Sequence, residues 1–423
     1  MKSFSLNKLV CIALCSTIAL TACENQNALS EKTAITKAAT IEQLAAKIAK
    51  ETLIIDTHID VPYRLDEKYE DVSKATAEGE FDYPRAIKGG LDVAFMSIYI
   101  PSKLQKTGGS KALADKLIND VETIVKQSPD KFALAYSTAQ VQENFVNGII
   151  SLPMGMENGS AIAGDLANLH HFYNRGIRYI TLAHAKTNHI ADSSYDENRP
   201  AQGLTDFGKK LIVEMNNVGV MVDISHVSDQ AFYQVMDISK VPVIASHSSA
   251  RFFTPGFERN MSDDMIKLLA KNGGVIQMTF SGVFTSQKFR EQSAAYKLVE
   301  AEFIKTNNLN EELEEDKSKI DTFEEAYLVK KPWDVGTLDL VLDHFEHVIK
   351  IAGIDHVGIG SDFDGVSGIL PQKLKDVASY PNLIAGLLKR GYSEQDIKKL
   401  LSGNIMRVWQ HVEKYAATHN TQY

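Results

Sequence analysis

Eight short apolar segments recur along the chain, and longer segments with the pattern of amphipathic helices separate them. The apolar segments span residues 53–57, 93–99, 149–156, 177–183, 220–225, 241–246, 275–279 and 356–361. Nearly continuous apolar strands that alternate with helices are typical of a parallel sheet whose two faces are both covered. Eight such units predict an α/β fold, the (β/α)8 TIM-like barrel.

One long segment interrupts this regular spacing. Residues 281–332 separate the seventh strand from the helix that precedes the eighth, and they are rich in charged residues, especially at 310–319. This composition predicts a solvated helical insertion between strands 7 and 8. Its first residues, 281–289, follow directly on a strand end, so we also expect them to reach over the mouth of the barrel and shape a substrate pocket.

The first residues have the pattern of an export signal. Lys2 and Lys8 precede an apolar segment at 9–19 that is too short to be a stable membrane anchor. The following Leu-Thr-Ala-Cys at 20–23 resembles a bacterial lipobox, which predicts a signal peptide over residues 1–22 and a lipid on Cys23. An ordinary secretory signal that is cut near Ala22 is the alternative.

The predicted organisation of the rest follows from this reading. Residues 23–40 are mostly small or polar and are expected to form a flexible tether, and residues 41–423 a single barrel domain. The other two Cys, Cys11 and Cys15, lie in the predicted signal peptide, so the mature domain would contain no disulfide. We therefore expect an exported bacterial lipoprotein that is anchored to a membrane and faces the periplasm or the exterior.

The charge of the chain excludes some partners. A net charge of −9 argues against nucleic acid and against an anionic membrane surface as binding partners. The predicted N-terminal lipid, rather than a basic patch, would hold the protein at a membrane.

Polar side chains that can bind metal follow most of the predicted strands. In a barrel of this type, residues at the carboxyl ends of the strands face the active site. These residues are His58, Asp60, Glu157, His184, His226, His247 and Asp362. A single His after a strand is more often a hydrogen-bonded structural residue than a ligand. Because the chain contains only 12 His, however, their repetition at strand ends predicts that they converge on one site.

The number and type of these side chains favour two metal ions. His58 and Asp60 alternate along an extended segment and therefore point the same way, and His226 and His247 are spaced as on neighbouring strands. Together with Glu157 they supply three imidazoles and two carboxylates, too many for one tetrahedral site that keeps an open position. Two ions that share a carboxylate fit better. Mixed nitrogen and oxygen ligands favour zinc, with manganese, iron or cobalt as alternatives.

Seven segments of the chain carry a resemblance to a known family. They are DTHIDVP at 56–62, GMENG at 155–159, RYITLAH at 178–184, VDISHVS at 222–228, PVIASHSSA at 242–250, RNMSDD at 259–264 and GIGSDFDG at 358–365. In this order, and over roughly residues 50–410, the sequence resembles the membrane dipeptidase (renal dipeptidase) family of metal-dependent amidohydrolase-like barrels. The resemblance implies that His58 and Asp60 bind one zinc ion, that His226 and His247 bind a second, and that Glu157 bridges the two.

The resemblance also implies roles in substrate binding and catalysis. His184 would lie beside the scissile carbonyl and stabilise its developing negative charge, Arg259 would hold the substrate's C-terminal carboxylate, and Asp362 would move protons. Asp223 and Ser225 are expected to support neighbouring ligands, and His189, Asp192 and Asp364 are expected near the pocket without an assigned role. One position departs from the family: Ser281 aligns with a Tyr of some members, which affects the floor of the pocket but not the metal chemistry.

These observations predict a metal-dependent dipeptidase. It would hydrolyse small free dipeptides through a water or hydroxide that bridges two zinc ions. The resemblance implies that L,D-dipeptides are among these substrates. Another dinuclear-metal amidohydrolase, acting on an N-acyl amide or a lactone, is one alternative, and a non-catalytic surface-binding lipoprotein is another. Family precedent also favours a homodimer.

Overall fold

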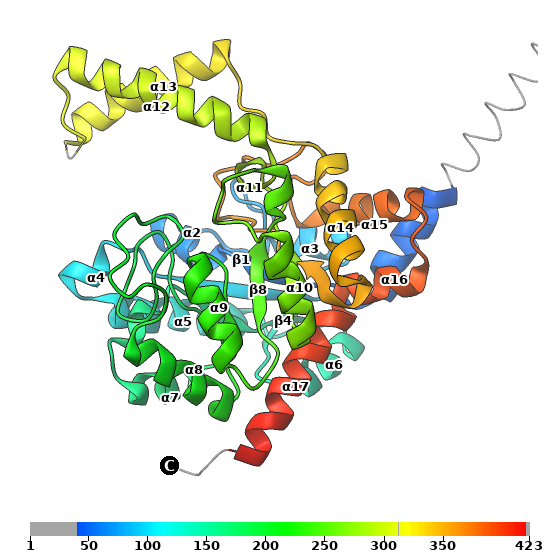
Figure 1. Ribbon diagram of the computed structural model, residues 1–423. Coiled ribbons are helices and arrows are strands. Elements are labelled where there is room, and N and C mark those ends of the chain that lie inside the picture. The colour runs from blue at the N-terminus through cyan, green and yellow to red at the C-terminus, as the bar shows by residue number, and fades with distance from the viewer. Residues whose placement is uncertain (1–39, 312, 420–423) are drawn as a thin grey trace, which may run out of the picture.

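The chain folds around one curled parallel sheet (Figure 1). The computed structural model describes residues 40–311 and 313–419. In these residues ten strands form the sheet, and every pairing between them is parallel. The strands are β1 (Ile55–Ile59), β2 (Val93–Tyr99), β3 (Phe132–Leu134), β4 (Ile150–Leu152), β5 (Met154–Glu157), β6 (Ile177–Thr181), β7 (Met221–Asp223), β8 (Ile244–Ser248), β9 (Val275–Met278) and β10 (Val357–Ile359).

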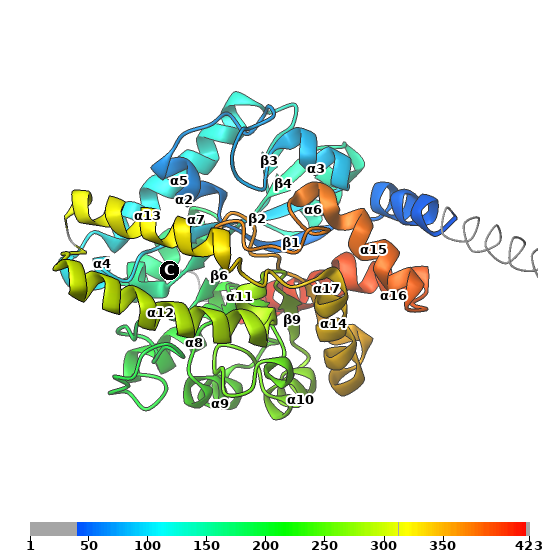
Figure 2. The ribbon, with the colours of Figure 1, turned by 90° about the horizontal axis from the view of Figure 1, so that it is seen from above.

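The two ends of the sheet meet and close the barrel. The sheet runs from β10 through β9, β8, β7, β6 and β5 to β2, which pairs with β1. The Asp362 amide then donates to the His58 carbonyl at 3.2 Å, and the Asp60 amide donates to the Phe363 carbonyl at 2.9 Å. Seen from above, the helices surround these strands (Figure 2). The predicted (β/α)8 TIM-like fold is confirmed.

Three details of the predicted strands were wrong. The segment at 149–156 is not one strand, because Pro153 separates β4 from β5 and supplies no N–H for the ladder. Strand β3, which pairs with β4, was not predicted, and its three residues are too few to show a pattern. In addition, β1 and β8 end two residues later than predicted, so that His58 and His247 lie within strands and not beyond them.

The helices that were predicted between the strands form the outer layer. They include α5 (Ser110–Gln127), α8 (Asp206–Val218) and α10 (Asp263–Asn272), close to the segments that show helical spacing. The last helix, α17 (Asn404–His419), closes the amino-terminal end of the barrel. Its Trp409 packs at 5.3 Å from the Phe95 ring, in one cluster with the first residues of β2, β7, β8 and β9.

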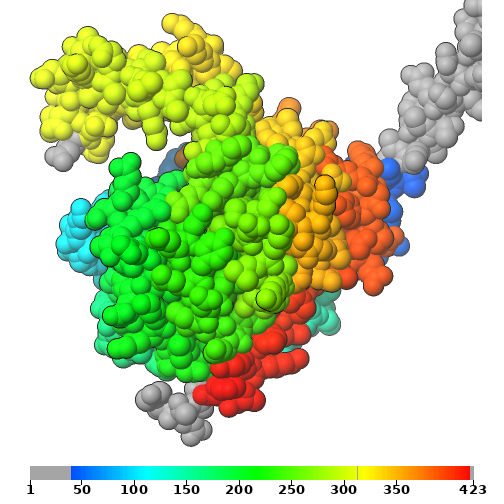
Figure 3. All heavy atoms as spheres, in the orientation of Figure 1, coloured from blue at the N-terminus to red at the C-terminus, as the bar shows by residue number. Residues whose placement is uncertain are grey.

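The insertion that was predicted between the seventh and eighth strands lies between β9 and β10, and it is helical, as predicted. It consists of the short α11 (Gly282–Thr285) and of a hairpin formed by α12 (Gln287–Asn307) and α13 (Glu314–Lys330). The hairpin projects from the body of the protein and extends across the barrel face in the view from above (Figures 2 and 3). Stacking of Phe303 on Phe323, with centroids 4.0 Å apart, joins its two helices.

The predictions for the N-terminus concern a part of the chain that the structure does not describe. The predicted signal peptide, Cys23 and residues 23–39 of the predicted tether all lie outside the described residues. Among the described residues, no helix is both long enough and apolar enough to cross a membrane.

Trp409 provides a test of how the barrel is closed. The side chain is fully buried, and its indole N–H has no hydrogen-bond partner among the described residues. We expect Trp409→Ala to lower the free energy of unfolding by about 3–5 kcal/mol because it leaves a large cavity. Trp409→Phe should cost less than half as much, since it keeps a ring and removes an unpaired donor. Urea unfolding of both variants measures the difference, and equal losses would contradict this account.

Candidate metal centre

The five residues predicted as metal ligands lie together at the carboxyl ends of the strands. They come from four parts of the barrel, namely β1 and the residue after it, β5, the segment after β7, and β8. All five are buried: His58, Asp60, Glu157, His226 and His247. Their nitrogen and oxygen atoms fall into groups of three whose members lie within 4.8 Å of one another, which is close enough for each group to hold a metal ion.

Two of these groups share Glu157. The first contains His58, Asp60 and Glu157, and the second contains Glu157, His226 and His247. Oε2 of Glu157 lies 3.5 Å from His58 Nε2, whereas Oε1 lies 3.2 Å from His226 Nε2 and 3.3 Å from His247 Nε2. Each carboxylate oxygen therefore faces a different group, which is the arrangement that a bridging ligand requires.

The ring of His58 is held in the orientation that a metal ligand needs. Its Nδ1 lies 2.8 Å from the Tyr179 hydroxyl, which donates its own proton to the Thr57 carbonyl at 3.0 Å. The hydroxyl therefore accepts from Nδ1–H, and Nε2 is left without a partner among the described residues. Burial alone lowers the pKa of His58, but Tyr179, Asp60 and Glu157 together raise it well above the usual value. The neighbouring carboxylates thus favour positive charge at Nε2, and a metal ion would bind there in place of the proton.

A second relay orients His247. Its Nδ1 lies 2.9 Å from the Ser246 hydroxyl, which donates to Asp223 Oδ2 at 2.6 Å. Nδ1–H must then donate to Ser246, so Nε2 carries the lone pair that faces Glu157. Burial, with a contribution from the Arg259 charge, holds the pKa of both His226 and His247 well below the usual value. Neutral imidazole is the form that binds metal.

Two buried aspartates fix the strand ends that carry these ligands. Asp56 accepts from the His58 and Ser361 amides and from the Tyr380 hydroxyl. Asp223 accepts from the Ser225 and Ser246 amides and from the Thr181 and Ser246 hydroxyls. A supporting role was predicted for Asp223, but none was predicted for Asp56 or Tyr179. The signal for Asp56 was its place two residues before His58, since such an Asp can accept the amide of that later residue.

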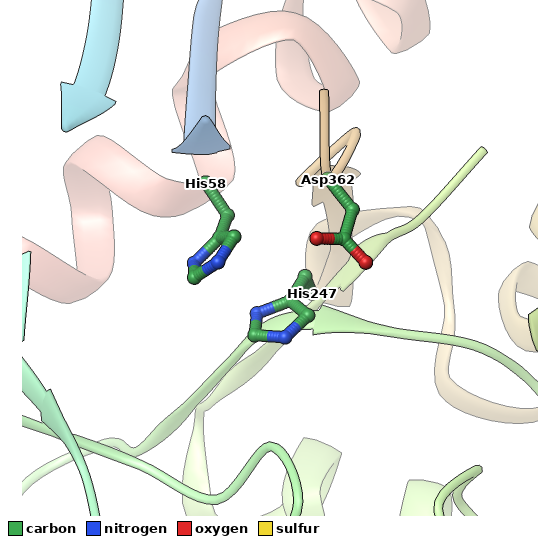
Figure 4. Close-up of side chains that lie close together, drawn as sticks. All are labelled: His58, His247 and Asp362. Atoms are coloured by element: carbon green, nitrogen blue, oxygen red, sulfur yellow. The ribbon is translucent and has the colours of Figure 1, made fainter. Parts of the chain in front are cut away.

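His184 and Asp362 face the same centre. His184 Nε2 lies 3.5 Å from Glu157 Oε1, and burial lowers the pKa of His184. The Asp362 carboxylate lies with His58 and His247 in a third group, and the three side chains point toward one another from β1, β8 and the segment after β10 (Figure 4). Burial, together with the charges of Asp60 and Glu157, raises the pKa of Asp362 to about 7.

Arg259 lies against the metal ligands and is buried. Its Nη2 donates to the His247 carbonyl at 2.7 Å and lies 3.0 Å from His226 Nε2. Its Nε has no partner among the described residues. The guanidinium is therefore close to the centre and keeps its Nε–H available, while its role toward a substrate carboxylate stays a prediction.

A cavity of about 280 Å³ opens onto the centre. Beside four of the predicted ligands, its walls include His184, Asp362 and side chains without a predicted role: Tyr63, Glu67, Tyr99, Asp364, Ser367 and the insertion residue Phe284. Phe284 confirms the expectation that residues 281–289 reach the pocket. His189 and Asp192 do not line this cavity; His189 belongs to the wall of another one. The volume is small for a ligand site and limits substrates to small molecules.

A closed α/β barrel with imidazole and carboxylate groups at its strand ends defines the class of metal-dependent barrel hydrolases. The sequence profile of the membrane dipeptidase family, peptidase family M19, matches residues 42–423. The chain therefore belongs to this family of metallopeptidases, and the resemblance noted in the sequence is confirmed.

Relatives and solved structures agree with the family match. An uncharacterized dipeptidase of Schizosaccharomyces pombe is 31% identical over 408 residues, which cover 89% of this chain and 84% of the relative. Dipeptidase tcpJ of Claviceps purpurea is 29% identical over 363 residues, which cover 84% of this chain and 74% of the relative. The crystal structure of the probable dipeptidase PvdM from Pseudomonas aeruginosa covers 89% of this chain and 100% of its own, with a TM-score of 0.78 and 26% identity.

The hydroxyl relay to His247 can be tested by metal affinity. Ser246→Ala removes the acceptor of His247 Nδ1–H, and we expect metal affinity to fall about 10–100-fold. Ser249→Ala is the matched control, because the Ser249 hydroxyl is buried without a partner among the described residues. Competition with a chelator of known affinity measures both variants. Unchanged affinity in Ser246→Ala would show that the relay does not orient a ligand.

Proposed function

We propose that this protein is a dinuclear zinc dipeptidase that hydrolyses small free dipeptides, L,D-dipeptides among them. The observation that carries the proposal is the geometry of Glu157, whose two oxygens face two separate groups of nitrogen and oxygen donors. Such a mixed donor set suits zinc, with manganese, iron and cobalt as alternatives. His58 and Asp60 would hold one ion, and His226 and His247 the other.

The metal ions would supply one part of the chemistry. Held by these residues, zinc ions would lower the pKa of a coordinated water and polarise the substrate carbonyl. The remaining steps belong to the side chains around the cavity. His184 lies beside Glu157 and can donate a hydrogen bond to the carbonyl oxygen as negative charge develops on it.

Asp362 is the group proposed to move the proton. Its carboxylate faces His58 and His247, and its pKa of about 7 lies where a carboxyl group can both accept and return a proton at neutral pH. It would accept the proton of the attacking water and deliver it to the leaving amine. Arg259, whose Nε has no hydrogen-bond partner among the described residues, would fix the free carboxylate at the other end of the dipeptide.

The size of the cavity and the family both support dipeptides as substrates. A volume of about 280 Å³ accommodates a dipeptide but not a folded or long chain. A metallopeptidase from Rhodobacter sphaeroides, whose crystal structure matches this fold with a TM-score of 0.68 at 24% identity over 86% of this chain, was solved with a phosphinate mimic of the dipeptide L-Ala-D-Ala. That ligand makes L,D-dipeptides the first substrates to assay.

The location and assembly of the protein are proposed from the sequence. Export through a signal peptide at 1–22 and a lipid on Cys23 would anchor the enzyme to a membrane, facing the periplasm or the exterior. There it would meet free dipeptides, and we expect it to form a homodimer.

Metal removal tests the dinuclear centre. The purified protein should contain about two divalent ions per chain and hydrolyse members of a panel of L,L- and L,D-dipeptides. Dialysis against a chelator should abolish turnover, and added zinc should restore it, because the metal ions supply the nucleophile. Elemental analysis is run on each sample. Full activity in metal-free protein would contradict the proposal. Hydrolysis of the L,L-dipeptides alone would show that L,D-dipeptides are not substrates.

The role of Asp362 has its own signature. Asp362→Asn should lower kcat by about 10²–10⁴-fold through the loss of proton transfer, while the metal content stays at the wild-type level. Glu67→Gln, on the exposed wall of the same cavity, serves as the matched control and should change kcat less than threefold. An Asp362→Asn variant that keeps its kcat, or that loses its metal, would exclude the proposed role.

A further inference from the structure

A second cavity adjoins the metal centre where the insertion leaves the barrel. It has a volume of about 680 Å³, and its walls come from three places: residues 194–199, residues 256–258, and the α12 residues Arg290 and Lys297. Tyr195 stands between the two cavities. Its ring lies 5.9 Å from the ring of the predicted ligand His226 and 5.9 Å from the ring of Phe257.

Arg290 is the unusual residue of this wall. Its guanidinium carbon lies 3.3 Å from the centroid of the Phe257 ring. In residues 40–311 and 313–419 its side chain has neither an ion pair nor a hydrogen bond, although the side chain is half-buried and burial lowers its pKa. Arg199 on the same wall differs, because it donates two hydrogen bonds to Glu258 at 2.8 and 2.6 Å.

The stacking leaves the binding edge of Arg290 free. A guanidinium that lies flat on an aromatic ring still presents its N–H groups in the plane of the fork, where a carboxylate can accept two hydrogen bonds. Partial removal of the cation from water without an anionic partner is unfavourable. The arrangement is therefore suited to an anion that arrives from outside the chain.

A continuous stack of rings and guanidinium groups connects Arg290 with Arg259. The Arg259 guanidinium lies 5.0 Å from the Phe284 ring, and Phe284 stacks on Phe257 with centroids 6.4 Å apart at 11°. Arg290 in turn lies over the Phe257 ring. Since Arg259 is proposed to hold the C-terminal carboxylate, Arg290 lies on the side of the C-terminal residue of the substrate.

The other charges of this wall favour the same kind of ligand. Lys297 follows Arg290 by two helical turns and likewise has no ion pair among the described residues. Of the acidic residues, Glu258 is engaged by Arg199, and Asp196 accepts from the Thr187 and Asn198 amides. Glu197 is exposed. Among the described residues of this wall, the cations without an acidic partner are Arg290 and Lys297 of α12.

We propose that Arg290 determines specificity by binding the acidic side chain of dipeptides whose C-terminal residue is Asp or Glu. The inference rests on the proposed dipeptidase function and narrows its substrate class. The insertion thus supplies a binding residue that the barrel alone does not have.

The matched substrates Ala-Glu and Ala-Gln, in L,L and L,D series, test this proposal, because Gln has the shape of Glu without its charge. Wild-type enzyme should show a kcat/KM for Ala-Glu at least tenfold higher than for Ala-Gln. Arg290→Gln should reduce this ratio about 10–100-fold, the contribution of a charge-assisted hydrogen bond, with kcat/KM for Ala-Gln within twofold of wild type. Lys305→Gln, which removes a positive charge from the far end of the same helix, should leave the ratio unchanged.

Other outcomes overturn the proposal. A wild-type ratio near one, or an Arg290→Gln variant that loses both substrates equally, assigns Arg290 to structure alone. Calorimetric binding of the products Glu and Gln gives a readout that needs no turnover, and wild type should bind Glu at least tenfold more tightly than Arg290→Gln does. If no dipeptide is hydrolysed but this difference in Glu binding is found, the proposed reaction is wrong and the acidic subsite stands.

Discussion

Glu157 places a carboxylate at the centre of a buried group of imidazoles, and each of its oxygens faces a different part of that group. Burial by itself raises the pKa of this carboxyl, yet His184, His58, His226 and His247 together hold it well below the usual value. Charged and polar groups that are removed from water are stable only when they satisfy one another. Without Glu157 the nitrogens would face one another without an acceptor, and His226 and His247 already approach to 2.8 Å. Metal cations bound between the Glu157 carboxylate and these ring nitrogens would satisfy both kinds of group in the same way.

The barrel supports this centre through buried hydroxyl groups. Tyr179 and Ser246 each accept a hydrogen bond from Nδ1 of a ligand and donate to a fixed acceptor, so the opposite ring nitrogen has its lone pair directed inward. The ring of Tyr179 also packs at 5.6 Å from Phe95, in the hydrophobic cluster that contains Trp409 of α17. The orientation of His58 therefore depends in part on the packing of this cluster. His226 and Asp362 have left-handed backbone conformations, with φ of 68° and 67°. Such conformations are unfavourable for residues other than glycine, and they persist where the surrounding structure imposes them.

The fold and the position of the centre follow from patterns that are local in sequence, and for that reason they could be predicted. The apolar strands give the barrel, and the barrel brings His58, Glu157, His226 and His247 to one end whatever their separation along the chain. What could not be predicted depends on contacts across the barrel. The hydrogen bond from His58 Nδ1–H to the Tyr179 hydroxyl joins residues that are 121 positions apart in the sequence. Neither segment contains a pattern that identifies the other as its partner. The stacking of Arg290 on Phe257 depends on how the insertion leaves the barrel, which a charged helical pattern does not encode.

The place of the insertion gives a physical reason for its effect on specificity. It begins directly after β9, and its first side chain over the cavity, Phe284, lies between Arg259 and Phe257. A change in this segment therefore alters the surroundings of the substrate's C-terminal residue without replacing His58, Glu157 or Asp362, which belong to β1, to β5 and to the segment after β10. Because the predicted metal ligands are oriented by relays within the barrel, the hairpin can vary in length and charge while the chemistry stays the same. Separate structural origins for reactivity and selectivity are what a family needs if one barrel is to act on dipeptides of different composition.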